Sequence, residues 1–450
     1  MWTPPDPNSL PSQSEVACAR NAILELEKTV QDNLEIIEQA KITIAALEKE
    51  IEGRRAWIAP IRKLPIEILA EIFVHCSSLS ELAPVTVSEV CRLWHQAILA
   101  TPQAWCLIDF GRHKKEEDES NYLSSFFERS KPWLVHLWIS KQMKTYSYDQ
   151  FYNPIPLLPS ALINPHLNRV SCLNIRDFEM KELSDVVFPT LSRLELAGYI
   201  ENGFPLDKAH FPSLSYLDCC DCELDPGPTG TEYPPLQYLS FYAAPDRRWV
   251  QVVKGCSSSL QALKTWGSFI GDDVTRVIKL ELPILTYLSL EDILDNDPKV
   301  AFRLQHTVTP KLLSYEEKAT GMRVLSLHGD VKHVKHLRTD SISTLSGYPS
   351  LRFLQLEFSW DHKGALTSPV EELVKLLRED PSICPAIETI EIFPSYSIGR
   401  NITGIWERLK VEADEMIQTP RPWIKLSFID QPGAIPGSLS EVQCKHGLPY

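Results

Sequence analysis

The chain has 450 residues, of which 44% are hydrophobic and 23% are charged, and its formal net charge is −14. These values are ordinary for a folded protein. At roughly 150 residues per domain, a chain of this length is expected to form two or three domains. The negative charge and the lack of a long basic run disfavour nucleic acid as the main partner, because phosphate binding needs clustered lysine and arginine.

The first 13 residues are rich in proline, and we expect them to be disordered. They have neither the basic start nor the apolar stretch of a secretory signal. No apolar run in the chain reaches the roughly 18 residues of a membrane span, so we expect no membrane partner. We therefore expect a cytoplasmic protein, a nuclear protein or one found in both places, with its 11 cysteines as reduced thiols.

A heptad repeat occupies residues 14–58. Seven β-branched aliphatic residues recur every seven positions: Val16, Ile23, Val30, Ile37, Ile44, Ile51 and Ile58. Three positions after each of the first six come Ala19, Leu26, Asn33, Ala40, Leu47 and Arg54. The two series are the a and d positions of a coiled coil. The pattern predicts one long helix that self-associates through Val16–Ile58, and the alternative is a single amphipathic helix packed on the rest of the chain.

Residues 59–108 predict two or three short helices with an excess of large apolar side chains. Pro65 suits the first turn of a helix, where its missing N–H group costs nothing. The apolar face of this helix is Ile68, Leu69, Ile72 and Phe73. The apolar face of the next helix is Val90, Cys91, Trp94, Ala97 and Ile98, with Trp105 after the stop at Pro102. A unit this small buries little of its own surface, so it must pack on the rest of the chain or on a partner.

Four motifs in this segment fall in the order and spacing of a known family. The family's Leu-Pro-x-Glu-Ile-Leu appears at Leu64–Leu69, its Ile-Phe at Ile72–Phe73, its Val-Cys-x-x-Trp at Val90–Trp94 and its Pro-x-x-Trp at Pro102–Trp105. The segment thus resembles an F-box, in the variant found in fungi, over about a tenth of the chain. Its middle, Ser77–Ser88, contains fewer leucines than is common in the family.

The resemblance implies that the segment binds a Skp-type adaptor, which links F-box proteins to a cullin–RING ubiquitin ligase. The residues that would meet the adaptor are Leu64, Pro65, Ile68, Leu69, Ile72, Phe73, Val90, Cys91, Trp94 and Trp105. The alternative is that the segment is an internal helical bundle without a partner.

A charged stretch, Gly111–Asn121, follows, and we expect residues 109–130 to form a solvated linker. From residue 131 to residue 430 a unit of the form apolar-x-x-apolar-x-apolar returns, at steps of 21 to 25 residues between Val170 and Leu285. Spacing and motif are those of leucine-rich repeats. We therefore expect an α-β solenoid after the long helix and the small helical F-box, with a target-binding concave face or a purely structural role. Residues 431–450 are expected to be a tail.

The sequence contains no strong signal for catalysis. The cluster Cys219, Cys220 and Cys222 lacks the paired C-x₂-C spacing of zinc modules, and His333 and His336 have no further ligand at motif spacing. Neither a phosphate-binding G-x-x-x-x-G-K-[ST] nor a G-x-S-x-G motif is present. We expect no metal, no cofactor and no enzymatic activity.

The expected function is that of a substrate adaptor of a Skp–cullin–F-box ligase, which holds a still unknown protein target. The alternative is a non-catalytic scaffold that uses the coiled coil and the repeats without a cullin.

Overall fold

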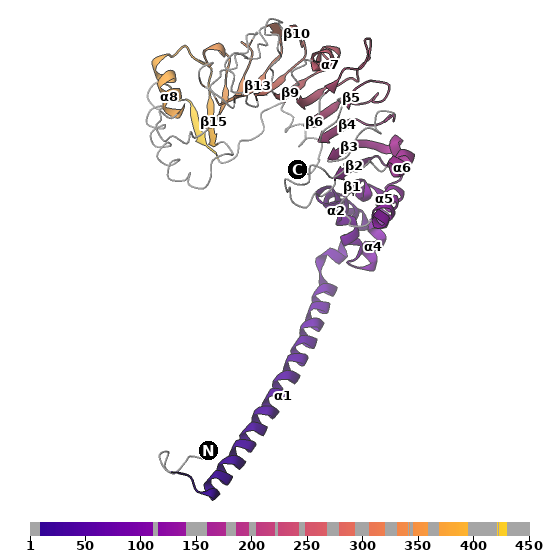
Figure 1. Ribbon diagram of the computed structural model, residues 1–450, viewed down its shortest axis with the longest axis vertical. Helices are drawn as coiled ribbons and strands as arrows, with labels where there is room; N and C mark the ends of the chain where they lie inside the picture. The colour runs from indigo at the N-terminus through magenta and orange to yellow at the C-terminus, as the bar shows by residue number, and fades with distance from the viewer. Residues whose placement is uncertain are drawn as a thin grey trace. The chain divides into compact units, whose positions relative to one another are not determined.

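The computed structural model (Figure 1) divides into two compact units, Met1–Leu69 and Ala70–Tyr450. The residues that it describes are 10–110, 116–140, 160–176, 186–197, 204–220, 224–242, 248–267, 279–292, 306–319, 331–340, 342, 345–358, 369–394, 421 and 423–429. Among the helices in these ranges, none has both the length and the apolar character that a membrane crossing requires.

A helix of 46 residues, α1 (Gln13–Ile58), makes up most of the first unit. Ser12 and Glu15 form a capping box at its start: the backbone N–H of Ser12 donates to Glu15 Oε2 at 2.7 Å, and the Ser12 hydroxyl accepts from the backbone of Glu15. Such a cap satisfies donors that have no partner within the helix. None of the 46 residues of α1 is buried. A 3₁₀ turn, η1 (Pro60–Lys63), follows it.

Short helices connect α1 to the first strand. They are α2 (Ile66–Leu79), α3 (Ala83–Ser88), α4 (Arg92–Leu99) and the 3₁₀ helix η2 (Pro102–Trp105). The boundary between the two units falls within α2, between Leu69 and Ala70. Pro84 and Pro102 lie in the first turns of α3 and η2, where proline removes no needed donor. These prolines divide the segment into short helices.

The second unit contains a parallel sheet of 13 strands. In spatial order they are β1 (Leu107–Phe110), β2 (Val135–Ser140), β3 (Val170–Arg176), β4 (Arg193–Ala197), β6 (Tyr216–Cys220), β8 (Tyr238–Tyr242), β9 (Ala262–Gly267), β11 (Tyr287–Asp292), β13 (Ser314–Ala319), β14 (His336–Thr339), β15 (Phe353–Phe358), β16 (Thr389–Pro394) and β17 (Lys425–Phe428). Spatial order follows chain order, so each strand pairs with the next one along the chain.

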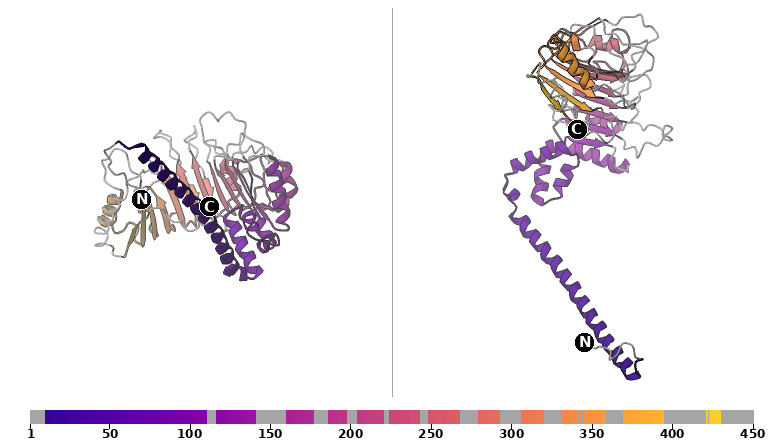
Figure 2. Two further views of the ribbon diagram at one scale, coloured as in Figure 1. Left: turned by 90° about the horizontal axis from the view of Figure 1, so that it is seen from below. Right: turned by 90° about the vertical axis from the view of Figure 1, so that its left-hand side faces the viewer.

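The described connections between these strands differ from one another. They contain α5 (Glu116–Arg129), α6 (Ser160–Ile163), η4 (Asn164–Arg169), α7 (Trp249–Gly255), η6 (Leu345–Gly347) and α8 (Pro369–Glu379). Two small parallel sheets join β5 (Phe204–Pro205) to β7 (Leu224–Asp225) and β10 (Lys279–Glu281) to β12 (His306–Val308). Figures 1 and 2 show α5 and α6 beside the first strands and α8 beside the last ones.

The core lies against one face of the sheet, because alternate side chains of a strand point to opposite faces. In β4, Leu194 and Leu196 are fully or almost fully buried, and Glu195 between them is half-buried. The register places Leu194 beside Leu217 of β6. A row of aliphatic side chains therefore crosses the sheet from strand to strand.

The predicted fold class, an irregular leucine-rich-repeat-like solenoid, is wrong. The strands form one large parallel sheet accompanied by helices, which is an α/β arrangement. A leucine-rich repeat needs a connection of similar structure in every copy. Here the described connections contain a helix after β1, β2, β8 and β15, and a strand of a small sheet after β4, β6, β9 and β11. The six-residue pattern predicts a buried parallel strand, but it does not predict the structure of the connection to the next strand.

The predicted charged linker at residues 109–130 is also wrong in its described part. Leu107–Phe110 form β1, and Glu116–Arg129 form α5, whereas Gly111–Lys115 lie outside the described residues. Leu123, Phe126 and Phe127 of α5 are buried at helical spacing, and this apolar face holds the helix in place.

Candidate functional site

Three of the ten residues predicted to meet an adaptor are in the protein interior. Leu69 and Trp105 have exposed fractions of 0%, and Phe73 has 1%. The indole of Trp105 donates to the carbonyl of Ile98 at 2.9 Å and packs edge-on against Phe126, with ring centroids 5.0 Å apart. Buried residues such as these shape a surface without touching a partner.

Three more of the predicted residues are half-buried: Leu64, Cys91 and Trp94. The ring of Trp94 lies 5.2 Å from that of Phe73, so α4 packs on α2 through this aromatic pair. Cys91 occupies the position before the first turn of α4. Trp94 therefore has one side in the core and part of its surface in solvent.

The remaining four are exposed: Pro65, Ile68, Ile72 and Val90. Pro65 and Ile68 belong to the first unit, and Ile72 and Val90 to the second. Three neighbouring residues of the second unit are exposed as well and were not predicted: Leu79, Leu82 and Leu93. Leu93 is next to Trp94, and Leu79 and Leu82 lie between the Ile-Phe and Val-Cys-x-x-Trp motifs, so hydropathy alone would have suggested them.

The second unit thus carries an exposed apolar set in α2–α4, which we name the docking set: Ile72, Leu79, Leu82, Val90 and Leu93. Their exposed fractions run from 38% for Ile72 to 67% for Leu79. A shallow pocket of ≈ 450 Å³ between α2 and η2 is lined by Ala70, Glu71, Val74, His75, Ser78, Thr101 and Gln103. Apolar side chains that are exposed on short helices are suited to contact a helix of another protein.

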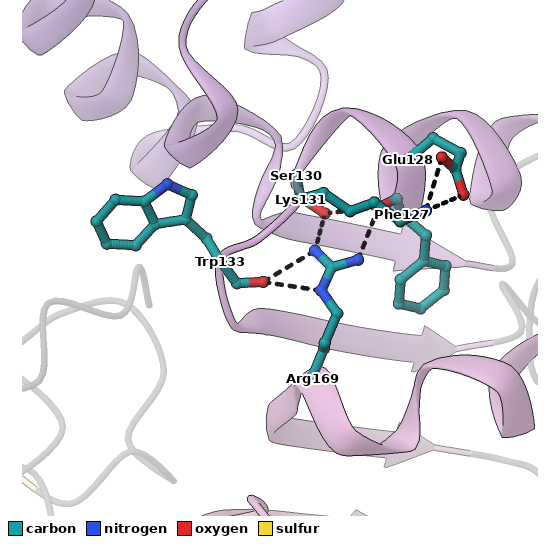
Figure 3. A network of polar contacts seen from close by, with 6 residues as sticks. All are labelled: Phe127, Glu128, Ser130, Lys131, Trp133 and Arg169. Carbon is teal, nitrogen blue, oxygen red and sulfur yellow. Dashed lines mark hydrogen bonds and ion pairs between the residues drawn. The ribbon is translucent and has the colours of Figure 1, made fainter.

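A hydrogen-bond network fixes α5 to the sheet next to this segment (Figure 3). Arg169 Nη1 donates to the carbonyl of Phe127 at 2.8 Å, and Nη2 donates to Ser130 Oγ and to the carbonyl of Trp133, each at 2.8 Å. The cation therefore lies at the C-terminal end of α5, where the helix dipole favours positive charge. Arg169 links α5 and the segment before β2 to the start of β3.

Replacing Arg169 by alanine should destabilise the α5 region by about 2 kcal/mol, because several carbonyl and hydroxyl groups lose a charged donor. Arg169→Lys should recover only part of this loss, since lysine keeps the charge but not the planar set of donors. Hydrogen exchange of the α5 amides measures the effect. Equal protection of α5 in the wild-type protein and in Arg169→Ala would contradict this role.

The sheet face opposite the core carries a row of polar residues, one from each strand at the same register. From β3 to β16 the row is Asn174, Glu195, Asp218, Ser240, Lys264, Ser289, Glu316, Arg338, Gln355 and Glu391. Two residues earlier, the same face carries Arg193, Tyr216, Tyr238, Tyr287, His336 and Phe353. We name this surface the polar face.

Many side chains of the polar face bond to their neighbours. Arg193 Nε donates to Glu195 Oε1 at 2.7 Å, and the Arg193 guanidinium lies 3.8 Å above the ring of Tyr216. Arg338 Nη1 lies 3.3 Å from Glu316 Oε1, and burial raises the pKa of the Asp218 carboxyl. Arg193 with Tyr216 and Arg338 with Glu316 are cross-strand pairs, which stabilise a sheet. The polar face therefore holds the strands together and presents charged and aromatic groups side by side.

A second pocket, of ≈ 640 Å³, lies at the small β5–β7 sheet and contains a histidine–aspartate pair. His210 Nδ1 and Asp207 Oδ2 are 2.6 Å apart, and Asp207 Oδ1 accepts from the backbone N–H of His210 at 2.9 Å. Among the described lining residues, the hydroxyl of Thr231 donates to the carbonyl of Pro228 at 2.8 Å. The pair therefore closes a turn and has no activated nucleophile beside it.

The described cysteines and histidines form no metal centre. Within the described part of the chain, no group of three or more His, Cys, Asp or Glu side chains could hold a metal ion. Cys219 is buried and Cys220 is exposed, and Cys222 lies outside the described residues. Burial raises the pKa of the Cys172, Cys256 and Cys384 thiols to about 12, so these thiols remain protonated and unreactive at neutral pH.

Comparison with known proteins adds no relative to these observations. No family model matches the chain, and no curated protein matches it either.

Proposed function

We propose that the chain is the substrate adaptor of a Skp–cullin–F-box ubiquitin ligase. The observation that carries the proposal is the docking set: the five large apolar side chains that the second unit leaves exposed between Ile72 and Leu93. They lie within the segment in which the sequence carries four F-box motifs in order. Folded proteins seldom leave such groups together on a helical segment unless a partner covers them.

The buried motif residues support the same proposal in a different way. Phe73 and Trp105 of the second unit are buried, and Trp94 packs on Phe73 and so joins α4 to α2. The motif then encodes two things, a core that sets the positions of the short helices and an outer surface for the adaptor. Pro65 and Ile68, which are exposed in the first unit, complete the motif.

The polar face of the sheet is the proposed surface for the target protein. Tyrosine, tryptophan and arginine are enriched at protein interfaces, and this face carries Tyr238, Trp266 and Arg338, all half-buried. The chain itself would perform no bond chemistry. It would raise the local concentration of target lysines beside the ubiquitin-transfer machinery.

Val90→Asp and Ile72→Lys test the docking set by recovery of a Skp-type adaptor from a mixture with the full chain. Each change places a charge in the expected interface and should weaken adaptor binding about tenfold or more, since an unpaired buried charge costs about 1–3 kcal/mol or more. The fold should be unaffected, because both positions are exposed.

Two matched controls are available in the same unit. Val187 has an exposed fraction of 50% against 58% for Val90, and Leu313 has 40% against 38% for Ile72. Val187→Asp and Leu313→Lys should leave adaptor recovery unchanged. The proposal fails if folded Val90→Asp and Ile72→Lys variants recover as much adaptor as the wild-type chain does.

A further inference from the structure

The surface of α1 carries a continuous apolar seam, and none of the seam residues is buried. The seam consists of the heptad positions a, of which Ile23, Val30, Ile37, Ile44, Ile51 and Ile58 have exposed fractions between 49% and 71%. Leu26 and Leu47, at heptad position d, have exposed fractions of 64% and 53%. A heptad repeat of aliphatic residues is the pattern of a helix that packs against another helix, and on α1 these residues are half-exposed.

We propose that α1 pairs with α1 of a second copy of this chain as a parallel, in-register coiled coil. β-branched residues at every a position, with leucine at some d positions, favour two parallel strands. The repeat matches itself over seven heptad positions without a break. In a pair with a second copy, every residue at heptad position a therefore packs against an apolar residue of the other helix.

The charges beside the seam fit this arrangement. In a parallel in-register pair, a residue at g faces the residue at e five positions later on the other chain. This brings Glu15 opposite Arg20 and Glu50 opposite Arg55 of the second copy, so opposite charges meet near both ends of α1. The four pairs between them join Ala22 to Glu27, Thr29 to Leu34, Ile36 to Lys41 and Thr43 to Glu48, and none contains like charges.

Polar side chains along the interface have their hydrogen bonds within their own helix. The hydroxyls of Thr29 and Thr43 donate to the carbonyls of Glu25 and Gln39 at 2.8 and 2.9 Å, and Asn33 Nδ2 donates to the carbonyl of Thr29 at 2.8 Å. Pairing can therefore bury them without leaving these donors unsatisfied.

Asn33 and Arg54 are the two polar d residues, and they bear on the register. In register, Asn33 meets Asn33 of the second copy, whereas a shift of one heptad places it at the level of Leu26 or Ala40. Arg54 would meet its own copy, and each Arg54 keeps a counter-ion, because its Nη2 lies 2.5 Å from Glu50 Oε1 of the same helix. One in-register arrangement therefore accommodates both residues.

Two isoleucines two positions apart provide the test. Ile44 lies in the seam with an exposed fraction of 54%, and Ile42 lies on the outer face of α1 with 58%. In sedimentation equilibrium of the full chain, the wild-type protein and Ile42→Lys should be dimers of a 51.2 kDa chain. Ile44→Lys should raise the dissociation constant more than about tenfold, because it places two like charges in the seam. Lysine is a good helix former, so helix content by circular dichroism should stay equal in both variants.

A cysteine at a d position tests the direction of the helices. In a Cys18→Ser background, Ala40→Cys should form a disulfide-linked dimer on mild oxidation, and Ala46→Cys on the outer face should not. A monomeric wild-type chain, a trimer, or equal effects of Ile42→Lys and Ile44→Lys would overturn the proposal. A dimer in which Ala40→Cys does not cross-link would overturn the parallel in-register arrangement.

Discussion

Replacing Trp105 by alanine is expected to destabilise the helical segment and the first strands by about 3–5 kcal/mol, the usual range for removing a buried tryptophan. The indole has no exposed surface, packs on Phe126 and donates to the carbonyl of Ile98. The guanidinium of Arg129 also lies 4.4 Å above its ring. Truncation leaves a cavity, and the carbonyl of Ile98 loses the indole donor while it keeps the backbone N–H of Thr101 at 3.1 Å.

Trp133→Ala is the matched control for this substitution. The Trp133 side chain is 49% exposed, and its contribution to the Arg169 network comes from its backbone carbonyl, which alanine keeps. We expect a loss of about 1 kcal/mol or less. Hydrogen exchange of β1 and α5, together with thermal unfolding, measures both variants. Similar losses for the two tryptophans would show that Trp105 is not a core residue.

Replacing Glu317 by glutamine is expected to stabilise the protein at alkaline pH and to change little at acidic pH. Glu317 lies in β13 with an exposed fraction of 3%, and its Oε2 atom has no hydrogen-bond partner. Burial, with the nearby Asp340 carboxylate, raises the pKa of Glu317 to about 8, from an ordinary value of 4.5. The folded protein therefore holds this side chain in its neutral form at neutral pH.

The sign of the effect follows from the protons bound in each state. Below pH 4.5 the carboxyl is protonated in the folded and the unfolded chain, and above about pH 8 it is ionised in both. Between these values only the folded chain keeps the proton, so stability falls as pH rises, by up to about 1.4 kcal/mol per pH unit. Glutamine carries no proton to lose and should remove this part of the slope.

Urea unfolding at pH 5 and at pH 8.5 measures the difference between the two proteins. Glu316→Gln is the control, because Glu316 is the next residue, points to the polar face and bonds to Arg338 and Tyr287. It should not abolish the fall in stability between the two pH values. The same fall in Glu317→Gln as in the wild-type protein would show that Glu317 is ionised in the fold.

Local patterns in the sequence predict local structure well in this chain. The heptads predict a helix over residues 14–58, and α1 spans Gln13–Ile58. The six-residue units at Leu191 and Leu214 fall on β4 and β6, because an alternation of apolar residues is what a strand packed on a core requires. Local pattern, however, carries no information on how the chain returns between strands, and this led to the wrong fold class.

Burial within the helix that follows Pro65 was harder to predict. Ile68, Leu69, Ile72 and Phe73 have the same apolar character in sequence, yet Leu69 and Phe73 are buried and the two isoleucines are exposed. A helix turns by about 100° per residue, so Ile68 and Ile72 share one side and Leu69 and Phe73 share another. Only tertiary packing shows which of the two sides is buried. A single motif can therefore contain both buried and exposed apolar residues.

Glu317 and the polar face could not be inferred from the sequence either. A glutamate inside a strand pattern is normally assigned to the solvent side, but the strand register places Glu317 beside Thr339 on the core face. The polar row depends on the alignment of strands whose row residues are 17 to 36 positions apart in the chain. Register is set by packing of the whole sheet and not by any one strand.

The most direct test of the proposed adaptor role is a capture experiment with the full chain, a Skp-type adaptor and a cullin. The wild-type chain should recover the adaptor and, through it, the cullin, and the double variant Ile72→Lys/Val90→Asp should recover neither. Val187→Asp/Leu313→Lys should behave as the wild-type chain does. Recovery of the adaptor without the cullin, or of neither by the folded wild-type chain, would contradict the account.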